Sequence, residues 1–90
     1  MLKNLEDLIS LARERKKNPK NNSYTNKLLN DITLSKSKVL EEINELIEAI
    51  EKDSNKIHEA ADVFYHLLIY LEANNINIEE VMEELGKRKK

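Results

Sequence analysis

The stretch from Lys56 to about Ala73 constrains the fold more than any other part of this 90-residue chain. Two sets of apolar residues cover opposite sides of the helix that its spacing predicts. The first set is Ala60, Val63, Phe64, Leu67 and Leu71, and the second is Ala61, Tyr65, Leu68 and Ile69. A helix that is apolar nearly all round is buried on several sides. Other helices therefore have to pack around this central segment.

Two helices are predicted before the central segment. Apolar spacing gives an amphipathic helix from Leu2 to about Lys17, and Asn18-Pro19 stops it because a proline disfavours helical geometry in the residue before it. A loop over residues 18–24 follows. Ser23 or Thr25 can cap a short second helix, since a hydroxyl oxygen accepts a free backbone N–H at a helix start.

A longer third helix and a short last helix complete the predicted elements. Ser35 or Ser37 can cap the third helix, which runs to about Glu51, and the polar turn over residues 53–55 then leads into the central segment. Asn74-Asn75 ends that segment. A last helix closed by Gly86 is indicated by the spacing of Ile78, Val81, Met82 and Leu85.

Chain length and composition set the fold class. A chain of this size makes one domain that buries only about 60 to 65% of its unfolded surface, so help from a second subunit is expected. One glycine, one proline and 40% hydrophobic residues favour helices over a sheet. We therefore predict a single all-α domain over residues 1–90, an antiparallel helical bundle of four to five helices that homodimerisation completes.

The composition also argues against several classes of protein. Without cysteine the chain forms neither a disulfide nor a thiolate zinc site. No apolar stretch approaches the roughly 18 residues of a membrane span, and the first residues lack a cleavable signal pattern, so a cytoplasmic protein without membrane contact is expected. Few aromatic residues and no groove-reading motif argue against nucleic-acid binding.

The net charge of −2 hides an asymmetry along the chain. Residues 1–40 carry nine basic and four acidic side chains, residues 41–86 carry two basic and thirteen acidic ones, and the Lys87–Lys90 tail adds four positive charges. A basic loop that faces an acidic core suggests polyphosphate bridged by a metal ion. Solvated helix faces and a frayed tail are the alternative explanation of the same charges.

Two acidic pairs, Glu42-x-x-Glu45 and Glu59-x-x-Asp62, lie on the third and the central helix. At about 100° per residue, the acids of each pair lie within roughly 60° of each other, beside an apolar face of their helix. On the third helix that face is Val39, Leu40, Ile43, Leu46, Ile47 and Ile50. Four carboxylates facing one another would hold Mg²⁺, which prefers oxygen ligands. Salt bridges to Lys38, Lys56 or a partner subunit are the alternative, because an isolated buried carboxylate is costly.

The histidines and tyrosines are weaker signals. His66 falls on the acidic stripe of the central helix, which leaves a role beside the metal ligands or against phosphate open, although a hydrogen-bonded core histidine is commoner. His58 is expected to point elsewhere and to lie on the surface. The three tyrosines are interpreted as packing residues with a polar tip, and only Tyr24 sits in a loop.

Three motifs follow one another along the chain. They are Ser23-Tyr24-Thr25-x-x-Leu28-Leu29, Lys38-Val39-x-Glu41-Glu42-x-x-Glu45 and Glu59-Ala60-Ala61-Asp62-x-x-Tyr65-His66-Leu67-Leu68. In this order and spacing they resemble the phosphoribosyl-ATP pyrophosphohydrolases of histidine biosynthesis, within the all-α nucleoside triphosphate pyrophosphohydrolase superfamily. Arg15 resembles a family position just before the substrate-side loop. Two departures affect local packing: Leu40 stands where members usually have glycine, and Ile50-Glu51 replaces a more apolar, alanine-rich stretch.

The resemblance implies a reaction and a set of site residues. The reaction is hydrolysis of the α,β anhydride of N1-(5-phosphoribosyl)-ATP to N1-(5-phosphoribosyl)-AMP and pyrophosphate, the second step of histidine biosynthesis, by a homodimer. The implied Mg²⁺ ligands are Glu42, Glu45, Glu59 and Asp62, and Glu42 or Glu45 is expected to take the proton of the attacking water. The substrate-binding candidates are Arg15, Lys16, Tyr24, Thr25, Lys27 and Lys38, and Glu41 and His66 are expected to support the ligands.

Two other functions stay open at this point. A related housecleaning enzyme that clears non-canonical or deoxynucleoside triphosphates would use the same acidic pairs, although the Ser23-Tyr24-Thr25 loop argues against it. A non-catalytic helical dimer that serves as an interaction module would account for the high charge and the small core. Mg²⁺-dependent release of pyrophosphate from phosphoribosyl-ATP and from common triphosphates separates the three functions.

Overall fold

The computed structural model describes residues 2–89 and contains five α-helices, with no strand in that part of the chain. The helices are α1 (Lys3–Lys17), α2 (Tyr24–Asn30), α3 (Ile32–Lys52), α4 (Lys56–Ala73) and α5 (Ile78–Lys87). The all-α prediction is therefore confirmed for residues 2–89. Met1 and Lys90, the ends of the predicted domain, lie outside the described residues. The closed bundle and its completion by a second chain stay predictions.

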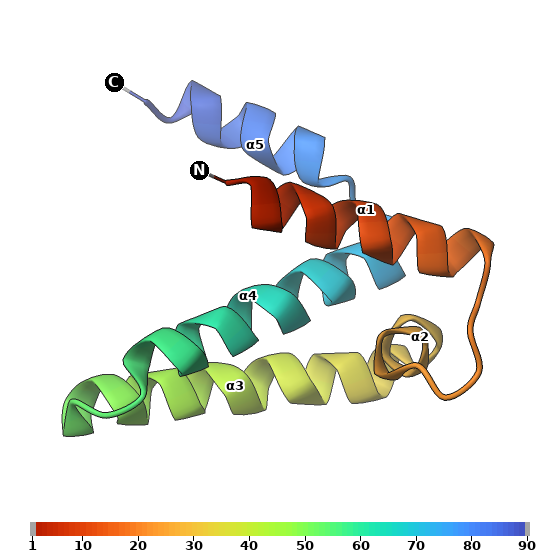
Figure 1. Ribbon diagram of the computed structural model, residues 1–90. Helices are drawn as coiled ribbons and strands as arrows, with labels where there is room; N and C mark the ends of the chain where they lie inside the picture. The colour runs from red at the N-terminus through yellow and green to blue at the C-terminus, as the bar shows by residue number, and fades with distance from the viewer. Residues whose placement is uncertain (1, 90) are drawn as a thin grey trace.

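Helix α4 is the central element. It runs antiparallel to α3, α2 covers one end of this pair, and α1 crosses the C-terminal half of α4 (Figure 1). Each of the other four helices contacts α4. This arrangement is the one expected for a helix with apolar residues on nearly every side. Within residues 2–89, none of the helices is long and apolar enough to cross a membrane.

The loop before α2 is held in place by a cap and an amide side chain. Ser23 is the N-cap of α2, and its hydroxyl oxygen accepts the backbone N–H of Asn26 at 3.2 Å. The side chain of Asn26 donates to the carbonyl oxygen of Arg15 at 2.8 Å and accepts the backbone N–H of Lys20 at 2.9 Å. These bonds fix the loop, so the residues at the start of α2 have a defined position.

The start of α3 differs from the prediction. Asp31, rather than Ser35 or Ser37, is the N-cap, and its carboxylate accepts the backbone N–H of Leu34 at 3.0 Å. A carboxylate that satisfies a free N–H earlier in the chain starts the helix there. Ser35 is fully buried inside the helix. Asp31 also follows directly on the last residue of α2, so a single residue joins the two helices.

The turn between α3 and α4 agrees with the prediction, and the end of α5 differs from it. The predicted polar turn joins α3 to α4, with Asp53 and Asn55 in the left-handed region at φ values of 53° and 56°. Asparagine and aspartate tolerate this region better than most residues. Gly86 does not close the last helix, because α5 continues to Lys87 and Gly86 has no positive φ.

The core of the single chain lies where α1, α2 and α4 meet. Its buried side chains are Ala12, Leu28, Leu29 and Ile69, and packed around them are Leu8, Leu34, Tyr65 and Ala73. This core is small for the length of the chain. It nevertheless holds α2 against α4. The motif residues Tyr24 and Thr25, at the start of α2, are thereby kept beside α4.

Several large apolar residues that were predicted to form core faces are exposed instead. They are Leu40, Ile43, Ile47 and Ile50 on α3, and Phe64 and Leu67 on α4. Phe64, for example, is 59% exposed. Within residues 2–89 no helix covers these faces, and their burial by a second chain stays a prediction.

Glu72, near the end of α4, is buried between cations of α1. Its carboxylate lies 3.2 Å from Arg13 Nε and 3.9 Å from Lys16 Nζ, and Lys16 also donates to its backbone carbonyl oxygen at 2.8 Å. Arg13 makes two further hydrogen bonds to Glu79, at 2.8 and 2.5 Å. These contacts fix α1 against α4 and against the start of α5.

Candidate functional site

The four predicted acidic residues lie on the facing sides of α3 and α4. Carboxylate oxygens of Glu42, Glu45 and Glu59 all lie within 4.8 Å of one another, and an oxygen of Asp62 lies within 4.8 Å of one of Glu59. The i, i+3 spacing turns both acids of a pair to one side of their helix, and the packing of α3 on α4 brings the two sides together. We call these four residues the acidic cluster.

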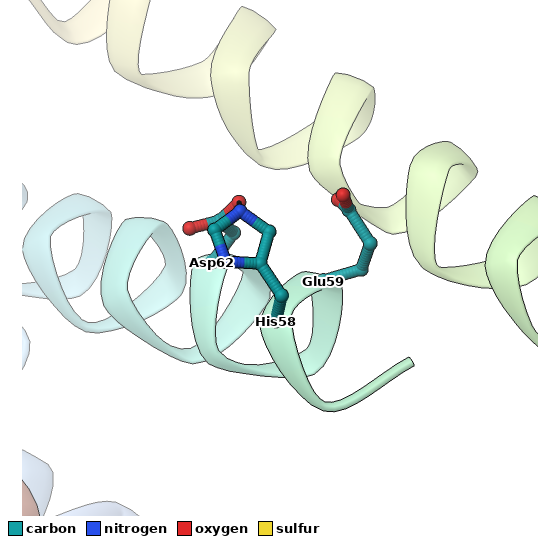
Figure 2. A group of neighbouring side chains, drawn as sticks. All are labelled: His58, Glu59 and Asp62. Atoms are coloured by element: carbon teal, nitrogen blue, oxygen red, sulfur yellow. Dashed lines mark ion pairs between the residues drawn. The ribbon is translucent and has the colours of Figure 1, made fainter. Parts of the chain in front are cut away.

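Figure 2 shows the α4 side of the acidic cluster, where Glu59 extends toward α3 while His58 and Asp62 lie next to each other. His58 Nε2 is 3.4 Å from Asp62 Oδ2. His58 is exposed, as predicted, but the expectation that it points elsewhere is wrong. Residues four apart are separated by only about 40° around a helix, so their side chains meet.

The acidic cluster is partly withdrawn from water. Glu42 is 8% exposed, Glu59 and Asp62 are half-buried, and Glu45 is exposed. One carboxylate oxygen of Glu42 and one of Glu59 are buried and have no hydrogen-bond partner. A buried carboxylate oxygen without a partner is costly. The described residues therefore leave these two oxygens without the hydrogen-bond donor or cation that would stabilise them.

The pKa values of Glu42 and Glu59 are both raised. Burial raises the pKa of Glu42 to about 7, and the neighbouring Glu45, Asp62 and Glu59 add to this in that order. Burial also raises the pKa of Glu59, and repulsion from Glu45 is the next cause. Both causes disfavour the charged form, and a bound cation would reverse the repulsion.

The salt bridges considered as an alternative do not form within the chain. Lys38 pairs with Glu41 at 3.2 Å, and Lys56 pairs with Asp53. Among residues 2–89, His58 is the only basic side chain within 4.0 Å of a carboxylate oxygen of the cluster. The negative charge of the cluster is therefore not balanced by lysine or arginine.

The residues of the acidic cluster fit a hard divalent cation. All four offer carboxylate oxygens, the donor type that Mg²⁺ prefers. The buried oxygens of Glu42 and Glu59 that lack partners belong to this same set. His58 adds a nitrogen donor at the exposed edge of the set.

A group of aromatic side chains joins α2 to α4 beside the cluster. Tyr24 Oη lies 2.9 Å from His66 Nε2, and His66 Nδ1 lies 2.8 Å from the carbonyl oxygen of Asp62. Thr25 Oγ1 and Tyr65 Oη are 2.5 Å apart. The rings of Tyr24 and Tyr65 stack with their centres 6.3 Å apart. Side chains of the first and third motifs are thus in direct contact.

Tyr24 also lies within reach of the charges of α3. Burial is the main cause that raises its pKa, Lys38 opposes this, and Glu42 and Glu41 raise it further. Tyr24 is nevertheless 45% exposed. It therefore stands at the boundary between solvent and the acidic cluster.

Two of the predicted basic residues lie beside Tyr24. Lys38 is close enough that Tyr24 contributes to the raised pKa of the ammonium, after the larger contribution of Glu41. Lys27 and Tyr24 line a shallow polar cavity of about 500 Å³ on the outer side of α2. Lys38 therefore lies near both Tyr24 and Glu42, whereas Lys27 lies at this cavity.

The two predicted substrate-binding residues of α1, Arg15 and Lys16, have other contacts. Arg15 donates from Nη1 to Ser23 Oγ at 2.6 Å, which places its guanidinium at the loop. Lys16 is held by Glu72 and by Asn75 Oδ1, the latter at 2.9 Å. The ammonium of Lys16 thus points to the end of α4.

Two contacts of the site, His58 with Asp62 and Thr25 with Tyr65, were not predicted from the sequence. The i, i+4 spacing of His58 and Asp62 was a usable signal, because such pairs meet on a helix. The bond between Thr25 and Tyr65 joins residues 40 positions apart, and no local pattern reveals such a contact. Tyr65 packs as predicted, but its hydroxyl also binds α2.

The fold and the acidic cluster define a class of protein: an all-α domain in which two antiparallel helices present paired carboxylates to each other and a short preceding helix presents a tyrosine beside them. The sequence places the chain more narrowly. Residues 3–89 match the family described as Phosphoribosyl-ATP pyrophosphohydrolase. The chain therefore belongs to the phosphoribosyl-ATP pyrophosphohydrolase family.

Individual relatives agree with this family. The phosphoribosyl-ATP pyrophosphatase of Clostridium acetobutylicum is 43% identical over 88 residues, which cover 93% of this chain and 79% of the relative. The protein of the same name from Methanocella arvoryzae is 36% identical over 91 residues, 96% of each chain. The histidine biosynthesis bifunctional protein HisIE of Pyrococcus furiosus is 40% identical over 93 residues, which cover all of this chain but 42% of that protein. The chain thus spans less than half of this bifunctional relative.

Proposed function

We propose that the protein hydrolyses the α,β anhydride of N1-(5-phosphoribosyl)-ATP, which yields N1-(5-phosphoribosyl)-AMP and pyrophosphate in the second step of histidine biosynthesis. Membership in the phosphoribosyl-ATP pyrophosphohydrolase family supports this reaction, as do relatives of similar length that are named phosphoribosyl-ATP pyrophosphatase.

One observation carries the proposal of a metal-dependent hydrolase. The buried oxygens of Glu42 and Glu59 have no partner, although they lie among other carboxylates on facing helices. Solvated surface acids would not leave buried oxygens unsatisfied, and structural acids would have lysine or arginine partners. A cation from solution would satisfy both oxygens.

We infer that this cation is Mg²⁺ and that the acidic cluster holds it. When bound, Mg²⁺ neutralises charge on phosphate oxygens and lowers the pKa of a coordinated water. The acidic cluster has the oxygen donors for such an ion. His58 lies at the exposed edge of the cluster, next to Asp62.

The residues of the chain carry the remaining steps. In the hydrolysis the water oxygen bonds to one phosphorus of the α,β anhydride, and the bond from that phosphorus to the bridging oxygen breaks, with its electron pair staying on the bridging oxygen. Glu42 or Glu45 accepts the proton of the water. Their negative charge beside the attacked phosphorus is tolerable only with the cation in place.

The basic residues around α2 are proposed to bind the phosphates. Arg15, Lys27 and Lys38 surround the start of α2 and balance phosphate charge, and Glu41 holds Lys38 in place. Lys16 would have to leave its contacts at the end of α4 to take part.

The remaining predicted contacts address the nucleotide. Tyr24 and Thr25 position it from the start of α2, and His66 supports Tyr24 from α4. The bond between Thr25 and Tyr65 keeps the start of α2 against α4 while the nucleotide binds.

A cytoplasmic homodimer is the proposed working form. The exposed apolar faces of α3 and α4 support it, because a second chain would remove them from water. Sedimentation of the full chain tests the dimer, and a stable monomer at micromolar concentration would reject it.

The reaction is tested by measuring pyrophosphate release from phosphoribosyl-ATP, ATP and common deoxynucleoside triphosphates, with and without Mg²⁺. Release only from phosphoribosyl-ATP, and only with Mg²⁺, is expected. Release mainly from the other triphosphates would favour a housecleaning enzyme, and no release from any of them would favour an interaction module.

The ligand set is tested with Glu45→Ala and Asp62→Ala, each of which should abolish release and leave the helical circular dichroism intact. Glu51→Ala is the matched control, since Glu51 is an exposed glutamate of α3 outside the acidic cluster. Near-normal activity in either ligand variant would reject the assignment.

A further inference from the structure

The hydrogen bond between Tyr24 and His66 has a direction that the geometry fixes. His66 is 6% exposed, and its Nδ1 lies 2.8 Å from the carbonyl oxygen of Asp62. A carbonyl oxygen only accepts hydrogen bonds, so Nδ1 carries the hydrogen. In a neutral imidazole the other nitrogen is then an acceptor. The hydroxyl of Tyr24 therefore donates to His66 Nε2 across 2.9 Å.

This direction decides what Tyr24 can offer to a ligand. A tyrosine hydroxyl has one hydrogen, and here His66 takes it. The lone pairs of the Tyr24 oxygen can still accept a hydrogen bond. The oxygens of an ionised polyphosphate have no hydrogen to give, whereas ribose hydroxyls and the N–H groups of a base do. Tyr24 is thus prepared for the nucleoside part of a nucleotide and unsuited to its phosphates.

The position of Tyr24 agrees with this chemistry. On one side it lies near Glu42 and Lys38 of α3, where the phosphates are proposed to bind. On the other side it lines the polar cavity of about 500 Å³ on α2, together with Lys27 and four asparagines. A nucleotide with its phosphates at the acidic cluster has its nucleoside next to Tyr24.

Building on the proposed function, we propose that His66 is a positioning residue that holds Tyr24 as a hydrogen-bond acceptor, and that Tyr24 thereby recognises a ribose hydroxyl or a base N–H of the substrate. The backbone carbonyl of Asp62 sets the tautomer of His66. Asp62, whose carboxylate belongs to the acidic cluster, therefore also orients Tyr24 through His66.

Two substitutions of His66 separate its two hydrogen bonds. His66→Asn keeps an N–H near the position of Nδ1, for the carbonyl of Asp62, but is too short to accept from Tyr24. His66→Gln places an amide oxygen near the position of Nε2, where it can accept from Tyr24, but loses the donor at Nδ1. Tyr24→Phe removes the hydroxyl and keeps the ring that stacks on Tyr65. Tyr70→Phe, on the same helix as His66, is the matched control.

Steady-state kinetics with phosphoribosyl-ATP give the first readout. We expect KM to rise about tenfold in Tyr24→Phe and in His66→Asn, with a smaller change in kcat, since one hydrogen bond is lost in each. His66→Gln should raise KM less than His66→Asn does. The double variant Tyr24→Phe, His66→Asn should show no further rise. Equal effects of the two His66 variants, or additive effects in the double variant, would overturn the proposal.

Binding of ATP and of inorganic tripolyphosphate in the presence of Mg²⁺ gives the second readout, measured by calorimetry. Tyr24→Phe should weaken ATP binding and leave tripolyphosphate binding unchanged. An equal loss for both ligands would mean that Tyr24 serves the phosphates or only the fold, and would overturn the proposal. Because Tyr24 is partly exposed and its ring is kept, this variant tests the proposal even if the His66 variants unfold.

The tautomer of His66 gives a third readout that needs no substrate. Nitrogen NMR of the full chain at neutral pH should find the hydrogen on Nδ1, and a hydrogen on Nε2 would overturn the proposal. If the wild-type protein fails to hydrolyse phosphoribosyl-ATP, the proposed function fails. The tautomer and the comparison of ATP with tripolyphosphate still decide the role of Tyr24 and His66.

Discussion

Glu42 and Glu72 are both buried glutamates, 8% and 6% exposed, and their surroundings are opposite. Glu72 sits between Arg13 and Lys16 of α1, so its charge is balanced inside the chain. Glu42 lies among the carboxylates of Glu45 and Glu59 with no ion pair to a lysine or arginine among residues 2–89, and one of its oxygens has no partner. Burial alone therefore says little about the role of an acid. The sign of the neighbouring charges separates an acid that holds helices together from one that is proposed to bind an ion from solution.

The largest effect expected from this comparison concerns turnover in Glu42→Gln. The amide has nearly the same shape but no charge, so it weakens the cation site and should lower kcat about 10²- to 10³-fold, the usual cost of losing one charge-stabilising group. Pyrophosphate release at saturating Mg²⁺ measures it. Because the like-charge repulsion is relieved, the metal-free variant should unfold at the same temperature as the wild type or higher. A lower unfolding temperature would mean that Glu42 is a structural acid.

The same substitution at the other buried glutamate should act on stability. Removing one partner of a fully buried ion pair costs about 3 to 5 kcal/mol, and we expect about 2 kcal/mol for Glu72→Gln, because the side chain of Arg13 is 36% exposed. Urea unfolding measures this change. Turnover should fall far less than in Glu42→Gln. If Glu72→Gln were as stable as the wild type, Glu72 would not be a structural acid, and the proposed difference from Glu42 would be wrong.

The smallest expected effect is a pH dependence of opposite sign in the two regions. The pKa of Glu42 is about 7 in the metal-free protein, above its ordinary 4.5, so its contribution to stability is complete below about pH 4.5 and is lost as the pH rises through 7. Arg13 lowers the pKa of Glu79 to about 2, so that contribution is present above pH 4.5 and is lost as the pH falls toward 2.

Thermal unfolding in a chelator, between pH 2 and 8, tests this contrast. The unfolding temperature of the wild type should fall over the upper part of this range, and Mg²⁺ should restore it. Glu42→Gln should flatten the upper part, and Glu79→Gln should flatten only the acidic end. A flat profile in the wild type would show that the acidic cluster is not under repulsion.

Much of the fold followed from local patterns. Apolar periodicity located the helices, and the all-round apolar character of α4 predicted its central place, because both depend only on residues within one segment. The meeting of Glu42, Glu45 and Glu59 also followed, since i, i+3 spacing and one packing of α3 on α4 are sufficient to bring them together. Their role as metal ligands stays a proposal.

Contacts between distant segments could not be predicted in the same way. The partners of Glu72 come from α1, 59 positions away in the case of Arg13, and nothing in the local sequence marks them. Periodicity located the apolar faces of α3 and α4, but it does not say whether helices of the same chain cover them, and in the single chain they are exposed. The cap of α3 was misplaced because two serines follow the aspartate that starts the helix, and local preference does not rank them.

Asp31 is the C-cap of α2 and the N-cap of α3, so the connection between the two helices is one residue long. Tyr24 stands on the first of them and Glu42 on the second. So short a connection restricts the distance between Tyr24, where the nucleoside is proposed to bind, and Glu42, where the anhydride is proposed to be hydrolysed. Selection by length then follows from the backbone itself: a ligand whose base and anhydride are spaced differently cannot reach both at once. Inserting glycines between Asn30 and Asp31 would lengthen this connection and leave the Asp31 cap of α3 in place.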